Sequence, residues 1–331
     1  MNFRELAESE EFSPLLVNED AALTQAPFYG EWHKALGRKV RRFVVERDGQ
    51  AILFAQIIKF PLPFGQSFLY IPYGPVVKGV VSNDIVEFAR EFFLKVLKEE
   101  GSVFLRFDHS FPIGVKTERA DASGYFQVRK EWVVDFAKSE DELLANMGKN
   151  HRYSIRTSQK KGVRVSFKEE NITEEFEKFY ALLSETSHRK GFGLVPREYY
   201  KATFESIEKE KNGFLVTTSS EGAILAYAVV VWFGKEARYL LGSSSTSFPE
   251  KLATYSLQWE VIKKLKTLGL FRYNLGGGAI DSGRLSHYKQ GFGAKLFDHG
   301  QMRDLIGKKI WYLLYRGRKV ISNIKRHEEI S

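Results

Sequence analysis

The pattern that most constrains the fold of this chain is an arrangement of strands and a helix that occurs twice. Residues 42–46 and 51–58 are β-prone runs on either side of an Asp-Gly turn, and they predict a hairpin. Residues 213–217 and 223–231 flank a Glu-Gly turn in the same way. Both second strands open with Ala-Ile-Leu, and these triplets lie 172 residues apart, at 51 and 223. The two hairpins therefore look like copies of one unit.

Each hairpin is followed by the same three elements: a third strand, an amphipathic helix and a closing strand. We expect them at 67–71, 83–99 and 103–107 in the first copy, and at 237–241, 253–268 and 271–275 in the second. Apolar residues recur along one face of the helix at 83–99, as they do in a helix that covers a sheet. Hairpin, strand, helix, strand is the core order of an acetyltransferase-like α/β unit.

The predicted fold class is therefore α/β (α+β), with two tandem GNAT-like (acyl-CoA N-acyltransferase-like) domains related by internal duplication. We place the first domain at 1–144 and the second at 145–303, followed by a basic amphipathic helix at 304–331 that packs back on the first domain.

Composition narrows the kind of protein. With 331 residues, of which 43% are hydrophobic, the chain can bury a large core. It contains no cysteine, which excludes disulfides, thiolate metal sites and a cysteine nucleophile. The longest apolar run, 223–233, is shorter than the roughly 20 residues that span a bilayer. Because residues 1–20 also lack the apolar core of a signal peptide, we expect a soluble, cytoplasmic protein.

The net charge of +9 favours anionic partners such as phosphates, RNA or an acidic membrane surface. Metal and hydrolase chemistry find no support, since the seven histidines form no HExxH motif. The run Gly-Ser-Ser-Ser at 242–245 is not a Gly-x-Ser-x-Gly nucleophile elbow. We expect it to form a turn in which Ser243 makes the bend or offers its hydroxyl to a ligand.

A second distinctive stretch lies near the C-terminus. Residues 285–294 read Leu-Ser-His-Tyr-Lys-Gln-Gly-Phe-Gly-Ala, after a predicted strand that ends in Asn-Leu-Gly-Gly-Gly at 274–278. This combination resembles the end of the FemABX peptidyltransferases, which are GNAT-like enzymes that move an amino acid from aminoacyl-tRNA onto a cell-wall precursor. The similarity extends over nearly the whole chain, with further stretches at 25–34, 61–75, 105–108, 149–156 and 189–193. Because no sustained heptad pattern is present, the chain resembles a short member without the family's helical arm.

The chemistry of such a reaction can be argued from general principles. Acyl transfer to an amine needs a deprotonated amine and stabilisation of the oxyanion that forms on the attacked carbonyl. Asp108 follows a predicted buried strand, at the edge where α/β folds place ligands. The resemblance implies that Asp108 contacts the amine or acts as its base, and that Lys289 stabilises the oxyanion or the tRNA terminus. The alternatives are a turn-capping aspartate and a surface lysine.

The resemblance implies further substrate contacts. Lys34 matches the lysine that holds the precursor's diphosphate, a role that suits a point charge. The remaining substrate-binding candidates are Tyr199, Tyr239, Tyr288, Ser243 and Phe292. An arginine expected just before Tyr199 is replaced by Val195, which leaves the identity of the acceptor open.

The donor is predicted partly from what the sequence lacks. Ordinary GNAT enzymes hold the coenzyme A pyrophosphate with a Gln/Arg-x-x-Gly-x-Gly/Ala loop. The nearest stretch, 188–193, begins with His188 instead. A donor other than coenzyme A is favoured, and we expect aminoacyl-tRNA as the donor and no cofactor.

Two basic segments bear on the partners. Residues 149–164 carry six cations and no acidic residue, and such a segment suits contacts with RNA phosphates. The predicted tRNA contacts are Lys149, Arg152, Arg156, Lys160 and Lys161. Residues 308–326 interleave apolar and basic side chains, so this helix is suited both to pack on the first domain and to rest on an anionic membrane.

We therefore expect an aminoacyltransferase that forms an amide bond between an amino acid from aminoacyl-tRNA and an amine of a peptidoglycan stem peptide, on a UDP- or lipid-linked muramyl-peptide precursor. It would be cytoplasmic, with transient contact at the inner membrane face. One alternative is a GNAT-fold N-acyltransferase with another acyl donor or a non-wall acceptor. The other is a non-catalytic protein that binds RNA or a membrane surface.

Overall fold

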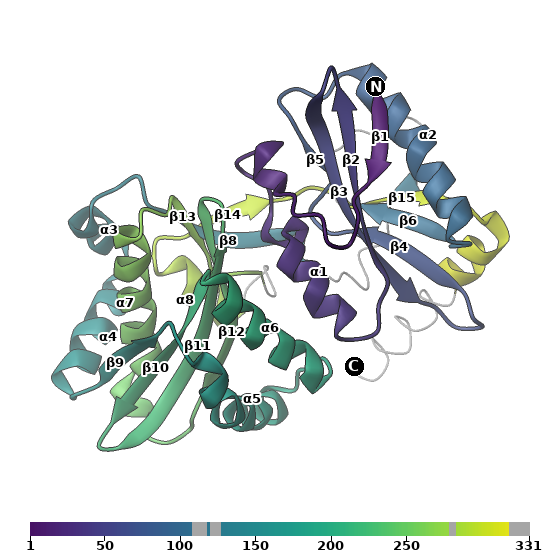
Figure 1. Cartoon of the computed structure of the whole chain (residues 1–331). Coiled ribbons are helices and arrows are strands. Elements are labelled where there is room, and N and C mark those ends of the chain that lie inside the picture. The colour runs from purple at the N-terminus through teal and green to yellow at the C-terminus, as the bar shows by residue number, and fades with distance from the viewer. Residues whose placement is uncertain (108–117, 120–126, 278–282, 318–331) are drawn as a thin grey trace. The chain divides into compact units, whose positions relative to one another are not determined.

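The chain is divided into two α/β units, each built on one sheet with helices packed against it (Figure 1). The computed structural model describes residues 1–107, 118–119, 127–277 and 283–317. The first unit comprises Met1–Arg129 and His299–Ser331, and the second unit comprises Lys130–Asp298. The chain therefore passes from the first unit to the second and back.

The first unit contains an eight-stranded sheet. Its strand order is β1 (Asn2–Glu5), β2 (Val40–Arg47), β3 (Gln50–Pro61), β4 (Ser67–Ile71), β6 (Phe104–Phe107), β15 (Arg303–Ile306) and β7 (Glu118–Arg119), and β5 (Val76–Val77) pairs with β3. The strands β4 and β6 pair in parallel. Helix α2 (Asn83–Glu99) covers the sheet with Ala89, Phe92 and Phe93, which pack against apolar side chains of the strands. The short helices η1 (Pro14–Leu16), η2 (Leu23–Gln25) and α1 (Pro27–Lys34) precede β2.

The second unit contains a seven-stranded sheet. Its strand order is β14 (Lys295–Asp298), β8 (Lys130–Asp135), β13 (Arg272–Asn274), β12 (Glu236–Ser244), β11 (Ala223–Phe233), β10 (Gly213–Ser220) and β9 (Arg164–Lys168), with β12 and β13 parallel. Its helices are α3 (Glu140–Asn146), α4 (Lys149–Lys160), η3 (Ile172–Glu175), α5 (Phe176–Lys190), α6 (Arg197–Glu210), η4 (Pro249–Lys251), α7 (Ala253–Thr267) and α8 (Arg284–Gln290).

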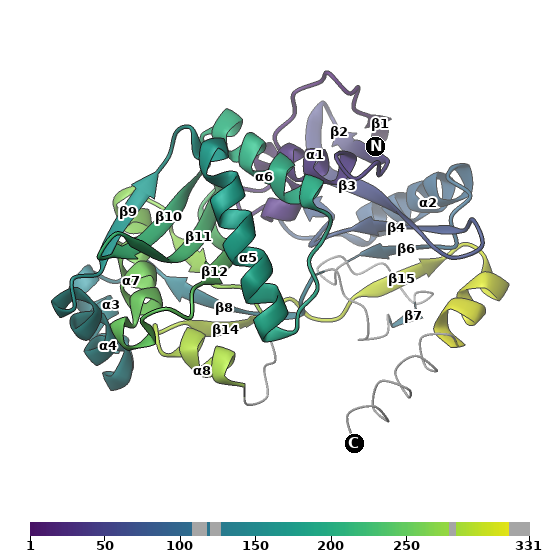
Figure 2. The ribbon, with the colours of Figure 1, turned by 90° about the horizontal axis from the view of Figure 1, so that it is seen from below.

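The faces of this second sheet are covered by different helices (Figure 2). Tyr227 of β11 meets Phe179 of α5, whereas its neighbour Ala228 belongs to the core beneath α7. Because successive strand residues point to opposite faces, α5 lies on one side and α7 on the other. Helix α6 packs against α5 through Tyr180 and Tyr200, and α4 packs against α7.

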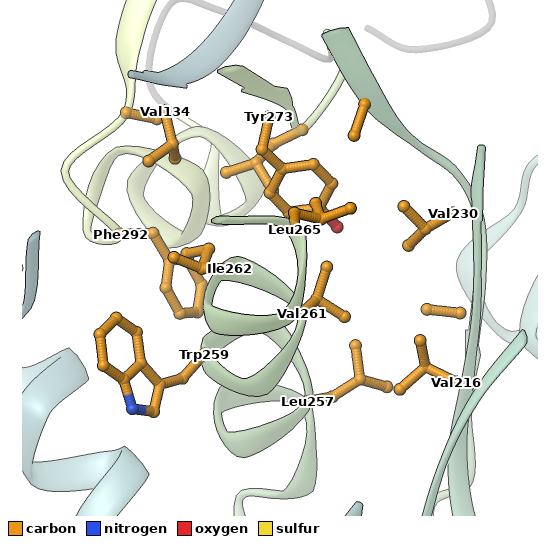
Figure 3. Packing of buried hydrophobic residues seen from close by; sticks show 14 of the residues in the cluster. Val134, Val216, Val230, Leu257, Trp259, Val261, Ile262, Leu265, Tyr273 and Phe292 are labelled. Carbon is orange, nitrogen blue, oxygen red and sulfur yellow. The ribbon is translucent and has the colours of Figure 1, made fainter. Parts of the chain in front are cut away.

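The core under α7 shows why this segment is a helix. Leu257, Val261 and Leu265 recur at a spacing of four residues, so they share one face and point at the sheet. Figure 3 shows them packed against Val216, Val230 and Tyr273, three of the strand residues labelled there. Burying each such side chain stabilises the fold by roughly 1.5–3 kcal/mol.

The predicted duplication is confirmed by the topology. The order β2-β3-β4-β6 with α2 between the last two strands is repeated as β10-β11-β12-β13 with α7. The predicted bounds of β4 and α2 coincide with those observed.

The domain bounds differ from the prediction. Residues 130–144 belong to the second unit, because β8 pairs with both β13 and β14 of that sheet. The corresponding place beside β6 is taken by β15, which comes from the C-terminal end of the chain. The first residues of the predicted helix at 304–331 are therefore a strand.

The described part of the predicted C-terminal helix runs over 309–317. Tyr312 and Tyr315 pack against Phe104 of β6, so this part of the helix packs on the first unit, as predicted. Across the described residues, no helix is long and apolar enough to cross a membrane.

Candidate active site

The strands β12 and β13 separate at the centre of the second sheet. Their parallel pairing ends at Arg238 and Asn274. On the other edge of β12 a β-bulge shifts the register, because Val229 pairs with Leu241 and Val230 with Tyr239. Bulges re-aim side chains beside active sites, and the ends of parallel strands form the crevice where α/β folds place ligands. This separation is the candidate active site.

Lys289 of α8 lies in this region as a buried group. Its side chain is 7% exposed, and its Nζ donates a hydrogen bond to the carbonyl oxygen of Gly277. The backbone that offers this oxygen is bent by Gly276, whose φ of 75° is a left-handed conformation that glycine adopts without strain. The Gly276 N–H donates to Oδ1 of Asn274 at 2.8 Å, which stabilises the bend. Lys289 is therefore not the surface lysine of the alternative interpretation.

The surroundings of Lys289 change its acidity. Burial lowers the pKa of Lys289 to about 8, Glu131 counteracts this and Arg238 adds to it. Lys289 thus remains mostly a cation at a pH of about 7, close to the point where it would lose its proton. A buried cation is suited to stabilise a developing oxyanion.

A charged network lies next to this lysine. Glu131 of β8 is buried and accepts hydrogen bonds from Nη1 and Nη2 of Arg238 at 2.6 and 3.0 Å. Nδ2 of Asn274 also donates to Glu131, at 2.7 Å. Glu131 therefore connects three strands and, through Asn274, the bend at Gly276. The sequence analysis missed Glu131 and Arg238; the available signal was a carboxylate inside the apolar strand 130–135.

Helix α4 is attached to the chain around Lys289. The Nε2–H of His151 donates to the carbonyl oxygen of Tyr288 at 2.8 Å, and the Gly148 N–H donates to the carbonyl oxygen of Gly291 at 2.9 Å. A Cβ atom at Gly291 would lie 1.9 Å from Cε1 of His151, so the close approach requires glycine. Burial lowers the pKa of His151, so the ring is neutral at neutral pH. The predicted motifs at 149–156 and 285–294 are thus in direct contact.

The aromatic residues around Lys289 hold α8 in place. The hydroxyl of Tyr288 donates to the carbonyl oxygen of Thr254 at 3.0 Å. Phe292 is a core residue, with its ring edge-on to those of Tyr288 and His151. Its surroundings are those of a packing residue rather than of the predicted substrate contact.

Tyr239 lies on the face of the sheet that α7 covers, beside the α7 core. Burial raises the pKa of Tyr239 to about 12, so its hydroxyl stays protonated. A Cβ atom at Gly242 would lie 1.5 Å from this hydroxyl, so Gly242 is the residue that lets the tyrosine reach across the bulge.

Ser243 and Tyr199 lie elsewhere in the unit. Ser243 is inside β12 rather than in the predicted turn, because the strand continues to Ser244. It pairs with Tyr227, whose ring meets α5, so Ser243 faces α5. Tyr199 is on α6, which packs against α5. The structure therefore places Tyr288 and Tyr239 beside the α7 core, and Ser243 and Tyr199 on the side of α5 and α6.

The predicted tRNA contacts fall into two groups. Nη1 of Arg152 donates to the carbonyl oxygens of Ala145 and Met147, and Nζ of Lys161 donates to that of Glu250 at 2.8 Å. These two cations help to fix α4. Lys149, Arg156 and Lys160 are exposed, and their side chains make no hydrogen bond or ion pair with other residues of the described ranges.

The three exposed cations form a stripe with Tyr153, which is 68% exposed. At 3.6 residues per turn, positions 149, 153, 156 and 160 fall on one face of α4. This stripe, Lys149, Tyr153, Arg156 and Lys160, is the α4 stripe. Sequence analysis had not singled out Tyr153.

Lys34 belongs to the first unit. Its Nζ forms ion pairs with Glu8 at 2.7 Å and Glu31 at 3.1 Å. Lys34 lines a surface pocket of about 360 Å³ whose other cationic lining residues are Arg38, Lys39, Arg41 and Arg42. Glu5 and Glu8 line the same pocket, so its cations are partly neutralised by carboxylates. Asp108 lies outside the described residues. Within the described ranges no group of His, Asp and Glu could hold a metal ion.

Comparison with known proteins shows which proteins this chain is similar to. The Lipid II:glycine glycyltransferase of Staphylococcus epidermidis is 19% identical, over 92% of this chain and 92% of that protein. The Staphylococcus aureus enzyme of the same name is 22% identical, over 82% of this chain and 83% of that protein.

Among solved structures, the crystal structure of FemX aligns with a TM-score of 0.82 at 19% identity, over 95% of this chain and 99% of that one. A tandem GNAT protein from the clavulanic acid biosynthesis pathway aligns with a TM-score of 0.55 at 11% identity, over 92% and 98%. These likenesses confirm the predicted fold of two tandem GNAT-like domains. The FemAB family description matches residues 109–219 and 201–312, which is more than half of the sequence. The chain therefore belongs to the FemAB family, as its motifs predicted.

Proposed function

We propose that this protein joins an amino acid, delivered by aminoacyl-tRNA, to an amine of a peptidoglycan stem peptide. The protein is an acyltransferase that forms peptide bonds, like the glycyltransferases to which it is similar. The observation that carries the proposal is the buried cation of Lys289, held where β12 and β13 separate.

The reaction requires one bond to form and one to break. The acceptor amine attacks the ester carbonyl carbon of the aminoacyl group and forms a tetrahedral intermediate with a negatively charged oxygen. When this intermediate collapses, the bond to the terminal ribose oxygen breaks. The amine gives up a proton, and the ribose oxygen gains one.

Each step has a candidate residue. The ammonium group of Lys289 stabilises the oxyanion, and a fixed donor of this kind is worth about 10²–10³ in rate. Asp108 accepts the proton of the amine. Lys34 holds the diphosphate of the precursor after release from Glu8 and Glu31. The protonated hydroxyl of Tyr239, which follows Arg238 on β12, is a neutral hydrogen-bond donor on a strand that borders the site.

The donor tRNA binds along the α4 stripe. Its three cations suit backbone phosphates, and the exposed ring of Tyr153 offers a surface on which a base can stack. Because His151 and Gly148 attach α4 to the chain around Lys289, bound RNA would lie next to the catalytic lysine. With RNA as the donor, the reaction needs no coenzyme A and no other cofactor.

The acceptor is a muramyl-peptide precursor, either UDP-linked or lipid-linked. A lipid-linked precursor would place the protein at the inner face of the membrane as a peripheral, otherwise cytoplasmic enzyme.

The experiment is transfer of radiolabelled amino acids from a charged-tRNA pool to purified UDP-linked and lipid-linked precursors. We expect label in one precursor, lost after ribonuclease treatment and in Lys289→Ala, and retained in the control Lys295→Ala. Lys295 is an exposed lysine of the same unit. The labelled amino acid and the favoured precursor identify the substrates.

Two results would overturn the proposal. Transfer that survives ribonuclease would indicate another acyl donor on the same fold. Binding of charged tRNA without transfer to either precursor, equal in wild type and Lys289→Ala, would indicate a non-catalytic RNA-binding protein.

A further inference from the structure

The C-terminal helix at 309–317 carries apolar side chains on two opposite faces. The inner face is occupied: Tyr312 is buried, packs on Phe104 and donates from its hydroxyl to Oδ2 of Asp304 at 2.9 Å. Asp304 in turn accepts two hydrogen bonds of 2.8 Å from Arg106. The helix is therefore fixed on the first unit through its inner face, beyond β15 (Figure 2).

The outer face is exposed. Ile310, Leu313 and Leu314 are 76%, 66% and 58% exposed, at the spacing i, i+3, i+4 that places them on one face. At 100° per residue this face lies opposite Tyr312. Packing of the helix on its own unit thus leaves these side chains in water.

A loop extends this surface. Phe64, at the tip of the turn between β3 and β4, is 79% exposed, and its ring centroid lies 6.3 Å from that of Trp311. We call Phe64, Ile310, Leu313 and Leu314 the outer apolar patch. Contiguous apolar surfaces of this kind mark interaction sites on soluble proteins.

The chemistry around the patch identifies its partner. Lys309 and Arg316 lie on one flank of the apolar face, and Lys308 is held at its base by a hydrogen bond to Gln66 of 3.1 Å. Trp311 forms the other flank, beside Phe64. Leucine and aromatic side chains bordered by lysine and arginine are the composition of helices that lie in the interface of an anionic bilayer. The net charge of +9 adds long-range attraction to such a surface.

We propose that the outer apolar patch inserts shallowly into an anionic lipid surface and holds the first unit there. The inference extends the proposed function, because a lipid-linked precursor lies in such a surface, but lipid binding itself requires neither donor nor acceptor. A second copy of the chain is a weaker fit, since a symmetric dimer through this patch would bring the flanking cations of both copies together.

The test is co-sedimentation of the full chain with vesicles of phosphatidylcholine alone or with about 30% phosphatidylglycerol, at low and high salt. Wild type should bind the anionic vesicles more strongly, and salt should weaken binding. Leu313→Ser/Leu314→Ser should lower the partition coefficient at least about tenfold, because two leucine side chains no longer enter the lipid. Leu16→Ser, an exposed leucine of the same unit, should bind like wild type.

A second readout places the contact. Brominated lipids should quench Trp311, since they quench only rings at the depth of the acyl chains, and the quenching should disappear in Trp311→Phe. Transfer to a UDP-linked precursor should be unchanged in Leu313→Ser/Leu314→Ser, which separates a failure of this inference from a failure of the proposed function.

The inference is overturned if wild type shows no preference for anionic vesicles, or if the double variant binds them as wild type does. It is equally overturned if the double variant abolishes a dimer in solution while wild type ignores lipid, since the patch then belongs to a second copy.

Discussion

Replacing Lys289 with methionine removes a buried ammonium group and keeps an unbranched side chain of similar length. The pKa of Lys289 falls from 10.5 to about 8 in the folded protein, chiefly through burial. This difference corresponds to a burial cost of about 3 kcal/mol for the charged form, and the side chain is only 7% exposed. Losing the hydrogen bond to Gly277 offsets about 1 kcal/mol of the gain. Lys289→Met should therefore raise the free energy of unfolding by about 2 kcal/mol at a pH of about 7.

The neighbouring charges also favour a higher free energy of unfolding in Lys289→Met. Glu131 keeps its two hydrogen bonds from Arg238 when Lys289 is removed, so no buried carboxylate is left without a cation. Because the folded pKa is depressed, the lysine is charged in both states below a pH of about 8, and its full cost applies there. Between about 8 and 10.5 the unfolded chain binds more protons than the folded one, so the wild type gains stability as the pH rises. The advantage of the variant should shrink over this window.

The assay is urea unfolding of wild type, Lys289→Met and the exposed-site control Lys295→Met at several pH values. The control should lie within about 0.5 kcal/mol of wild type. If Lys289→Met is less stable than wild type at neutral pH, or if its advantage does not change with pH, the reasoning about this lysine fails.

Three further outcomes follow from the same geometry. If Lys289 acts as a cation, the transfer rate should fall as the pH rises through about 8, the pKa of Lys289, and a rate that rises there would assign it the role of a base. Glu131→Gln should destabilise the fold by about 3 kcal/mol in thermal or urea unfolding, because it leaves buried Arg238 with only Glu236, at 3.5 Å, as a carboxylate partner. A double variant with Arg238→Met should recover part of that loss, and no recovery would refute the pairing. Tyr153→Ala should weaken tRNA binding by about 1–3 kcal/mol without changing its salt dependence, whereas Arg156→Gln should reduce the salt slope by about 1. Equal effects of both variants in fluorescence anisotropy would contradict the separate roles.

Much of the fold could be predicted because its signals are local. The apolar spacing of α2 lies within one segment and predicts its bounds, and the turns at 48–49 and 221–222 identify the hairpins. The placement of β8 in the second sheet and of β15 in the first could not be predicted in this way. The residues of β8 do not tell whether this strand pairs with β6 or with β13.

In the candidate site, too, residues within local motifs could be predicted, whereas contacts between residues distant in sequence could not. Lys289 was predicted from its motif, but its pKa is lowered by burial, and the opposing effects of Glu131 and Arg238 come from residues distant in sequence. Gly291 was part of the motif, but glycine is required there because the ring of His151, 140 residues earlier, leaves no room for a Cβ atom. Ser243 was placed in a turn because Gly-Ser-Ser-Ser favours turns, whereas the bulge in β12 and the pairing with β11 continue the strand through it.

The most direct test of the account is the single-turnover rate of amino-acid transfer from purified aminoacyl-tRNA to a UDP-linked precursor, in wild type and in Lys289→Met. We predict a loss of about 10²–10³ in rate, with unchanged tRNA binding and a fold at least as stable as wild type. A variant that transfers within about threefold of the wild-type rate would contradict the central role of the buried lysine.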